Sequence, residues 1–294
     1  MIPLATALLA ALAATASPPA AEAAPPTIVT ACAGRDGWSD AAPPAHVYGN
    51  TWYVGTCGIS AILITSDQGH VLVDGGTPQA APLVLANIAA LGFRPQDVRL
   101  ILSSHEHFDH AGALAALKRA TGAKVAALAT EAEVLETGKP VAADPQYGQL
   151  DGFDPVTVDR VLADGDSVTL GKLAVTAHAT PAHSPGSTSW TWQACTPDFT
   201  CRMIAYADSA TAISADGYRF ADHPDRVAAV RQGLSTIAAL PCDILLTPHP
   251  SASATLERLA GETPLVDPSA CAAYATAARE RFEQRLDAEG GKRR

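Results

Sequence analysis

The sequence lacks several patterns that would assign it to a familiar class of protein. None of its six cysteines stands in a Cys-x-x-Cys pair, so a thiolate metal site is not predicted. Positive charge is scarce, with 20 Lys and Arg against 30 Asp and Glu and a net charge of -10. This balance argues against a nucleic acid or an anionic membrane as partner. No repeat or linker is found after the first residues, so we expect one domain over residues 30–294.

The chain begins with an apolar leader rich in alanine. Residues 2–16 carry no charge, and the run is too short for a membrane span of roughly 20 residues. Small-x-small sites follow at residues 14–16 and 21–23. The pattern predicts a secretory signal peptide over residues 1–23 and export to the periplasm. No Lys or Arg precedes the run, and the alternative is a disordered leader rich in Ala and Pro.

The number of cysteines agrees with export. All six follow the leader, and an even number in an exported chain predicts disulfides. Pairing in sequence order would close three short loops, Cys32–Cys57, Cys195–Cys201 and Cys242–Cys271. The alternative, buried free thiols, requires a cytoplasmic protein.

Strand and helix patterns alternate along the chain. Apolar, β-branched runs predict strands at 52–65, 70–76, 98–104, 123–129, 187–192, 201–207 and 242–248, and two more within 166–180, separated by a turn at Gly171. Helical spacing predicts helices at 81–93, 111–122, 223–240 and about 268–289. The alternation indicates an α/β fold, and two such halves would form a four-layer αβ/βα sandwich.

One short segment concentrates metal-ligand side chains. His105, His107, Asp109 and His110 directly follow the apolar strand at 98–104. Ligand sites in α/β proteins gather at such strand ends, where rigid elements hold the loops. A single tetrahedral zinc does not comfortably accept four ligands from so short a segment, so two metals are predicted.

Two further histidines also lie at the ends of predicted strands. His183 precedes a Pro-Gly turn, and His249 follows a buried apolar strand between two prolines. A histidine taken singly is more often structural than a ligand, but the cluster makes chance a poor explanation. We interpret the others in the mature chain as structural or exposed: His46, His70, His178 and His223.

The motif H-x-H-x-D-H after an apolar strand, with L-V-D-G-G at residues 72–76 upstream, resembles the metallo-β-lactamase superfamily. The resemblance extends over residues 52–249 and implies the αβ/βα sandwich with metals at its edge. It assigns the first zinc to His105, His107 and His183. It assigns the second zinc to Asp109, His110 and His249.

Within that superfamily the chain is similar to subclass B3 β-lactamases. Position 107 is His rather than Glu, which argues against the di-iron relatives, and the stretch IAYADSATA at residues 204–212 has Asp208-Ser209 where a Cys ligand would stand. One departure is Ala182, where Gly commonly precedes the third histidine. The resemblance implies that a metal-bound hydroxide, oriented by Asp109, opens the lactam amide of penicillins, cephalosporins and carbapenems. It also implies a small-molecule β-lactam as partner, and we expect a monomer.

Several residues receive weaker assignments from the same resemblance. Ser209 and Thr211 would hold the substrate carboxylate, and Gln146 would border the groove. Asp74 is expected to be a buried support. Asp208 either bridges both metals, as in lactonase and thioesterase relatives, or lies behind a ligand. A lactone or thioester hydrolase is therefore the alternative enzyme, and a periplasmic zinc binder is the non-catalytic one, although no long His-rich tract is found.

Overall fold

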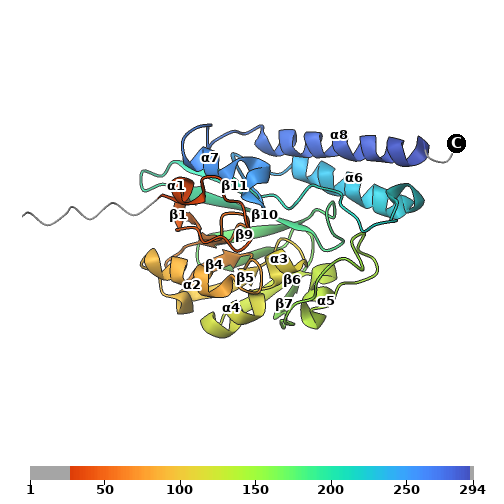
Figure 1. Ribbon diagram of the computed structural model, residues 1–294. Helices are drawn as coiled ribbons and strands as arrows, with labels where there is room; N and C mark the ends of the chain where they lie inside the picture. The colour runs from red at the N-terminus through yellow and green to blue at the C-terminus, as the bar shows by residue number, and fades with distance from the viewer. Residues whose placement is uncertain (1–26, 292–294) are drawn as a thin grey trace, which may run out of the picture.

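The computed structural model describes residues 27–291 of the chain. The predicted signal peptide, residues 1–23, lies outside these residues. Within them, two β-sheets pack face to face, and a layer of helices covers the outer face of each sheet (Figure 1). The predicted four-layer αβ/βα sandwich is therefore confirmed.

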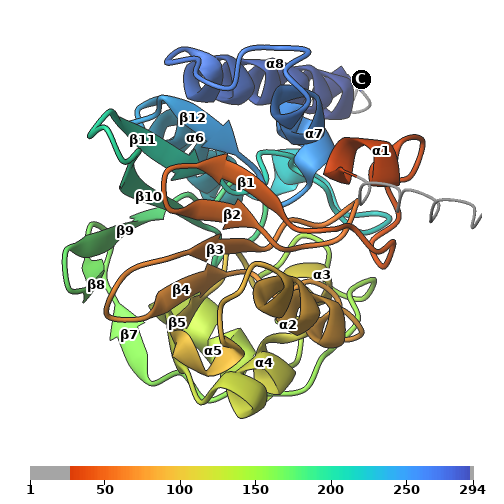
Figure 2. The same cartoon turned by 90° about the vertical axis from the view of Figure 1, so that its left-hand side faces the viewer.

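The larger sheet is built from the first half of the chain. Its strands in spatial order are β1 (Ala45–Tyr48), β2 (Thr51–Tyr53), β3 (Ile62–Ile64), β4 (His70–Val73), β5 (Val98–Leu102), β6 (Lys124–Leu128) and β7 (Arg160–Leu162). The pairs from β1 to β4 are antiparallel, whereas those from β4 to β7 are parallel. The parallel part places the carboxyl ends of β4 and β5 at the same sheet edge. Figure 2 shows β1 to β5 in this order.

The smaller sheet is built from the second half. Its strands in spatial order are β12 (Ile244–Leu246), β11 (Cys201–Tyr206), β10 (Thr188–Cys195), β9 (Leu173–Ala179) and β8 (Ser167–Leu170). All pairs are antiparallel except β11 with β12, which is parallel. The segments that follow β11 and β12 therefore leave the sheet at the same edge.

Helices cover both outer faces of the pair of sheets. On the side of the larger sheet lie α2 (Ala81–Ala90), α3 (Phe108–Ala111), α4 (Leu114–Thr121) and α5 (Ala129–Thr137). The remaining α-helices are α1 (Ile28–Cys32), α6 (Pro224–Ala238), α7 (Thr255–Leu259) and α8 (Ala270–Gly291). Three short 3-10 helices are Pro95–Asp97, Phe220–Asp222 and Pro250–Ser253. Among residues 27–291, no helix combines the length and the apolar character that a membrane crossing requires.

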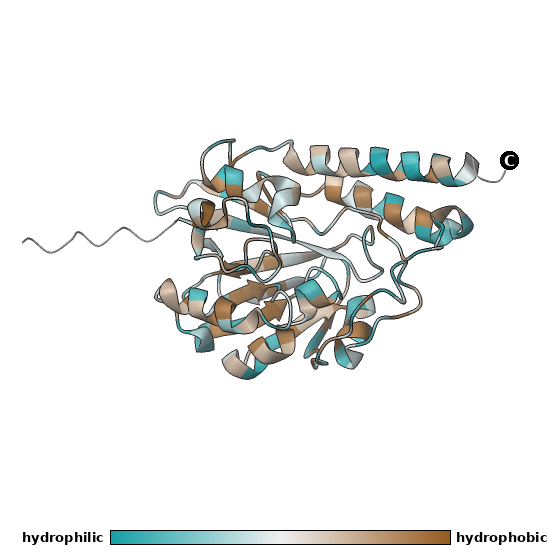
Figure 3. Ribbon diagram, in the orientation of Figure 1, coloured by the Kyte–Doolittle hydropathy of each residue, from teal (hydrophilic) through white to brown (hydrophobic). Residues whose placement is uncertain are grey.

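The alternation of side chains along the strands creates three cores. Ile62 and Ile64 of β3 face the smaller sheet, while Leu63 between them packs under the helices. Likewise Tyr206 of β11 lies between the sheets and Ala205 faces α6 and α8. Because successive side chains point to opposite faces, strands buried on both sides are apolar throughout. Figure 3 shows this as brown strands between helices that carry teal residues.

Three disulfides join the cysteines in sequence order. They are Cys32–Cys57, Cys195–Cys201 and Cys242–Cys271, as the order of the cysteines predicts. The first ties α1 to the loop after β2, the second closes the β10–β11 hairpin, and the third links the start of β12 to α8. No free cysteine remains among the described residues.

Two predicted elements are divided in the structure. The strand predicted at 52–65 is two strands, because the Val54 and Thr56 amides donate to Ala61 and Ile59 and close a tight loop. The helix predicted at 111–122 is α4, with a separate α3 before it. The break lies near Gly112, where a Cβ would lie 2.2 Å from the carbonyl oxygen of Phe108.

Candidate metal centre

The six predicted ligands approach one another at one edge of the sandwich. β5 ends at Leu102, and the chain then carries His105 and His107 before α3 begins. His183 lies in the turn between β9 and β10, and His249 follows β12. Each ligand segment therefore follows a strand of one of the two sheets, and the strand holds the loop in place. Asp109 and His110 lie on α3, one short step from the loop.

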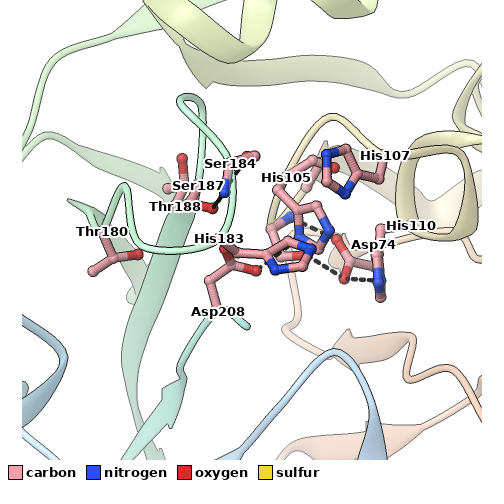
Figure 4. A network of polar contacts seen from close by, with 12 residues as sticks. Asp74, His105, His107, His110, Thr180, His183, Ser184, Ser187, Thr188 and Asp208 are labelled. Atoms are coloured by element: carbon pink, nitrogen blue, oxygen red, sulfur yellow. Dashed lines mark hydrogen bonds and ion pairs between the residues drawn. The ribbon is translucent and has the colours of Figure 1, made fainter. Parts of the chain in front are cut away.

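His105, His107 and His183 form one compact group (Figure 4). One potential ligand atom from each lies within 4.8 Å of the others, and all three side chains are buried. Ring centroids are 4.7 Å apart for His105 and His107 and 4.8 Å apart for His105 and His183. These distances allow three nitrogen atoms to reach one ion.

A second group lies on the other side of His105. His105, Asp109 and His110 also offer ligand atoms within 4.8 Å of one another. His249 joins this group, since its Nε2 lies 3.3 Å from Nε2 of His110 and 3.4 Å from Oδ2 of Asp109. Its side chain is 30% exposed, so the second group borders solvent.

In three of the histidines, one ring nitrogen contacts a group that is not a predicted ligand. Nδ1 of His105 lies 2.8 Å from Oδ1 of Asp208, and Nδ1 of His183 lies 2.7 Å from the carbonyl oxygen of Thr211. Nε2 of His107 lies 2.9 Å from Oδ2 of Asp144. Such partners fix the ring orientation and the tautomer. The other nitrogen of each ring is then available as a ligand.

Asp74 supports residues 103–107, the metal loop that carries His105 and His107, as predicted. Its carboxylate accepts hydrogen bonds from the Ser104 amide (2.6 Å), the Ser104 hydroxyl (2.7 Å) and the Tyr206 hydroxyl (2.7 Å). One of its oxygens also lies 3.4 Å from Nδ1 of His110. Asp74 is completely buried and has a φ of 63°, a backbone region that Asp tolerates better than most residues. It joins both sheets to the metal loop.

The ionisation of these groups suits metal binding. Burial lowers the pKa of His183 to about 3. Burial, together with the nearby His110, lowers the pKa of His105 well below its usual value, so both rings are neutral. Burial opposes the ionisation of Asp109, but the adjacent His110 lowers the pKa of the carboxyl overall. In turn Asp109 raises the pKa of His110 to about 10 despite its burial, and an ion that binds there displaces this proton.

The donor set fits a transition metal. Nε2 of His105 is buried and has no hydrogen-bond partner among the described residues. A buried polar atom without a partner is costly, and a bound ion would satisfy it. Imidazole nitrogens with one carboxylate are ligands of the kind that zinc accepts. The chain therefore has a metal-binding centre of His and Asp residues.

The three predicted substrate residues lie at different positions around this centre. The amide nitrogen of Gln146 lies 3.4 Å from Nε2 of His183. The hydroxyl of Thr211 lies 3.3 Å from Nδ1 of the same ring, and Thr211 is exposed. Ser209 is buried, directly after Asp208. Gln146 and Thr211 thus contact a predicted ligand, and Ser209 follows a residue that does.

Sequence reasoning missed several residues of the site. Asp144, the partner of His107, lies two residues before Gln146, and its place in an acidic, Pro-containing loop was the available signal. Trp38 lies in a segment without a clear sequence pattern. Its exposed ring has its centroid 5.8 Å from the ring centroids of both His249 and Phe108. Trp38 therefore adds an aromatic wall beside the second group.

A buried carboxyl near the centre predicts a pH effect on stability. Glu131 of α5 is fully buried, and neither carboxylate oxygen has a hydrogen-bond partner among the described residues. Burial, reinforced by Glu106, raises the pKa of Glu131 well above its ordinary value of 4.5. The folded protein therefore keeps the proton, while the unfolded chain releases it above that value. The contribution of Glu131 to the free energy of unfolding is therefore fully present below its ordinary pKa of 4.5. It is lost as the pH rises through the folded-state pKa.

The Glu131→Gln variant should lack this dependence. From about pH 5 to pH 7 the free energy of unfolding of the unsubstituted protein should fall relative to that of the variant. We expect this difference to change by roughly 1–3 kcal/mol in favour of the variant. The measurement is urea unfolding of both proteins at the two pH values, with a chelator present throughout. Parallel stability curves for the two proteins would contradict a neutral Glu131.

Comparisons with known proteins agree with this geometry. Residues 54–262 match the family model of the metallo-beta-lactamase superfamily. The metallo-beta-lactamase MIM-1 from Novosphingobium pentaromativorans is 67% identical, with a TM-score of 0.90 over 91% of this chain and 99% of that one. MEM-A1, a subclass B3 metallo-beta-lactamase from a soil metagenome library, is 44% identical, with a TM-score of 0.83 over 87% of this chain and 100% of that one.

Curated relatives give shorter matches. A hydroxyacylglutathione hydrolase of Anaeromyxobacter dehalogenans (strain 2CP-C) is 37% identical over 131 residues, which are 45% of this chain and 41% of that protein. The chain spans about half or less of the length of the curated relatives it matches. The family model itself matches well over half of the chain, across the segments that carry all six predicted ligands. The chain therefore belongs to the metallo-beta-lactamase superfamily, and its structural neighbours include enzymes of subclass B3.

Proposed function

We propose that this chain is a zinc-dependent β-lactamase of the subclass B3 type. The observation that carries the proposal is the grouping of Asp109, His110 and His249 beside a cluster of three histidines, without a cysteine ligand. The overall likeness to MIM-1, which includes 67% identity, supports the same chemistry. Penicillins, cephalosporins and carbapenems are the substrate classes we expect.

The proposed complement is two zinc ions. His105, His107 and His183 would hold the first, and Asp109, His110 and His249 the second. Bound zinc supplies Lewis acidity toward a carbonyl oxygen and lowers the pKa of water toward ~7. No serine or cysteine nucleophile is then needed, so no acyl-enzyme is expected.

The protein's own groups would orient the reactants. Asp109 is ionised, because His110 lowers the pKa of its carboxyl, so it can accept a hydrogen bond from the attacking water. Ser209 and Thr211 would donate hydrogen bonds to the substrate carboxylate, and Gln146 would border the groove.

The Ser209→Ala variant should therefore raise KM for a carboxylate-bearing β-lactam more than it lowers kcat. Steady-state kinetics of the variant and the parent give both values. An unchanged KM would remove Ser209 from this role.

A lactone or thioester hydrolase is the alternative that the hydroxyacylglutathione hydrolase relative suggests. In that case Asp208 would bridge both metals. The observed contact favours the other interpretation, since Asp208 Oδ1 lies 2.8 Å from Nδ1 of His105, leaving Nε2 of that ring as the free nitrogen. Asp208 would then support a ligand rather than act as one.

The test is hydrolysis of a penicillin and a carbapenem by the purified chain, with and without a chelator. We expect ring opening of both, with nearly complete loss after chelation and recovery on addition of zinc. A chain that binds zinc but opens neither ring, and instead cleaves a thioester or a lactone, would establish the alternative. Absence of both zinc binding and turnover would overturn the proposal.

The protein is further proposed to act in the periplasm. Three disulfides support this location, because such bonds form and persist in oxidising compartments. Recovery of the protein in the periplasmic fraction of expressing cells is the corresponding measurement. Recovery in the cytosol with reduced cysteines would contradict it.

A further inference from the structure

Glu106 stands between two predicted ligands but turns its carboxylate toward a different loop. It lies between His105 and His107 and is only 4% exposed. Its Oε2 accepts a hydrogen bond from the Ser184 hydroxyl (2.7 Å), and its Oε1 accepts one from the Gly186 amide (3.0 Å). Among residues 27–291, no Lys or Arg forms an ion pair with it. A buried carboxylate that accepts these two hydrogen bonds joins the two segments directly.

The receiving loop is the one that carries His183. It runs from the end of β9 to the start of β10, and Figure 4 shows Ser184 and Ser187 on it beside His183. Ser187 also lies 3.1 Å from Ser184, oxygen to oxygen, so the loop is tied within itself. A Cβ at Gly186 would lie 2.5 Å from Oε2 of Glu106. It would also lie 2.8 Å from the Cα of Glu131, a backbone atom that cannot give way, so the loop requires glycine at that position.

The other side of the same loop rests on α6. The guanidinium of Arg226, which is 9% exposed, donates to the carbonyl oxygens of Pro181 and Ala182. A Cβ at Gly233 of the same helix would lie 2.8 Å from the Ala182 nitrogen. Glycine at 233 thus lets α6 approach the backbone of the turn at Ala182. The loop is held by a buried cation before His183 and by a buried carboxylate after it.

We propose that Glu106 is a positioning residue that sets the distance of His183 from His105 and His107, and thereby the affinity of the first metal position. The inference rests on the metal assignment proposed above. The three ligands come from two loops, and Glu106 is a side chain of one loop that bonds to the other. Groups behind metal ligands commonly change metal affinity when they are removed, although they never touch the ion.

Other contacts between these segments do not depend on Glu106. The Thr188 amide donates to the carbonyl oxygen of Ser104 (2.7 Å), and the Trp190 indole donates to that of Ser103 (2.8 Å). These bonds link β10 to the end of β5 whatever stands at position 106. A substitution of Glu106 should therefore loosen the His183 loop without separating the two sheets.

Three substitutions separate the hydrogen bonds of Glu106 from its charge and its bulk. Glu106→Met keeps the length of the side chain and removes both acceptors. Glu106→Gln removes the charge but keeps one acceptor for the Gly186 amide and an amide group that can donate to Ser184. Glu131→Gln is the matched control, a carboxyl buried in the same region that makes no hydrogen bond to either loop.

The experiment measures zinc bound per chain at buffered free zinc, with each substitution placed in the His249→Ala background. In that background the first position is measured alone. We expect Glu106→Met to weaken zinc binding by about 10- to 100-fold. Glu106→Gln should stay within about threefold of the parent, and Glu131→Gln should match it.

Three outcomes would overturn the inference. Parental affinity in Glu106→Met would show that the link is not needed, and an equal loss in Glu106→Gln would show that charge matters instead of hydrogen bonding. If Glu106→Met does not fold, Ser184→Ala serves in its place, because it removes one of the two donors to Glu106. We expect it to weaken zinc binding several-fold. An unchanged zinc affinity in Ser184→Ala would reject the proposal. Absence of zinc binding by the unsubstituted chain would reject the proposed function as well, whereas tight binding by every variant would reject only this inference.

Discussion

The His249→Ala variant is expected to remain folded and to lose most of its hydrolytic activity. The imidazole is 30% exposed and follows β12 at the mouth of the site, so its removal leaves a solvent-filled gap rather than a cavity in a core. Its Nε2 lies 3.4 Å from Asp109 and 3.3 Å from His110, and its side chain is the most exposed of the three in the second group. Loss of one ion removes several kcal/mol of charge stabilisation, so kcat/KM should fall by about 10²–10³-fold.

Three measurements decide this prediction. Bound zinc should fall from two ions to one at moderate free zinc, the urea midpoint of the metal-free protein should stay nearly constant, and turnover should collapse. His223→Ala is the matched control, because that exposed ring stacks on Tyr218 at 4.3 Å and is none of the proposed ligands. Unchanged kcat/KM in His249→Ala would remove His249 from the site.

The grouping of the six proposed ligands could be predicted because their segments follow strands with a clear pattern. The apolar run that becomes β5 leads directly into His105, and the run that becomes β12 leads into His249. Strands buried on both faces can be recognised in the sequence as continuous apolar runs. In an α/β sandwich the ends of such strands meet at one edge. The sequence therefore predicts that the proposed ligands lie together at one edge of the sandwich.

The partners of the ligands could not be predicted in the same way. Asp144 reaches His107 from a loop without periodic structure, and Arg226 reaches the His183 turn from a helix 44 positions further along the chain. Such contacts depend on how loops fold back over the sheets. A carboxylate or guanidinium in the sequence does not show which distant group it will meet, so these roles emerge only from the packed structure.

Short elements were missed for a related physical reason. β7 has three residues, two of them exposed, and α5 follows β6 without a break. A three-residue strand with one buried side chain shows no alternation, and the buried face of α5 includes the charged residue Glu131 beside Val134 and Leu135, which obscures its apolar spacing. Both are defined by their neighbours, since β7 adds to the edge of β6 through three register pairs. Long apolar runs, by contrast, were identified wherever the sandwich buries both faces of a strand.

The Asp74→Ala variant should be the most destabilising single change near the site. It would leave three donors without an acceptor in a buried position, namely the Ser104 amide, the Ser104 hydroxyl and the Tyr206 hydroxyl. It would also place alanine at a φ of 63°, where a side chain with Cβ is strained. Together these effects should lower the free energy of unfolding by about 3–5 kcal/mol.

The loss should reach the metals as well as the fold, because Asp74 lies 3.4 Å from His110 and supports the residue before His105. We expect weaker zinc binding by about 10- to 100-fold in any folded Asp74→Ala protein. Tyr206→Phe is the matched control: it removes one of the three donors and keeps the acceptor, so it should cost only about 1 kcal/mol. Urea unfolding of the two variants, each metal-free, compares them directly. Equal stabilities would mean that Asp74 acts only through Tyr206 and that the Ser104 bonds contribute nothing to the rigidity of the metal loop.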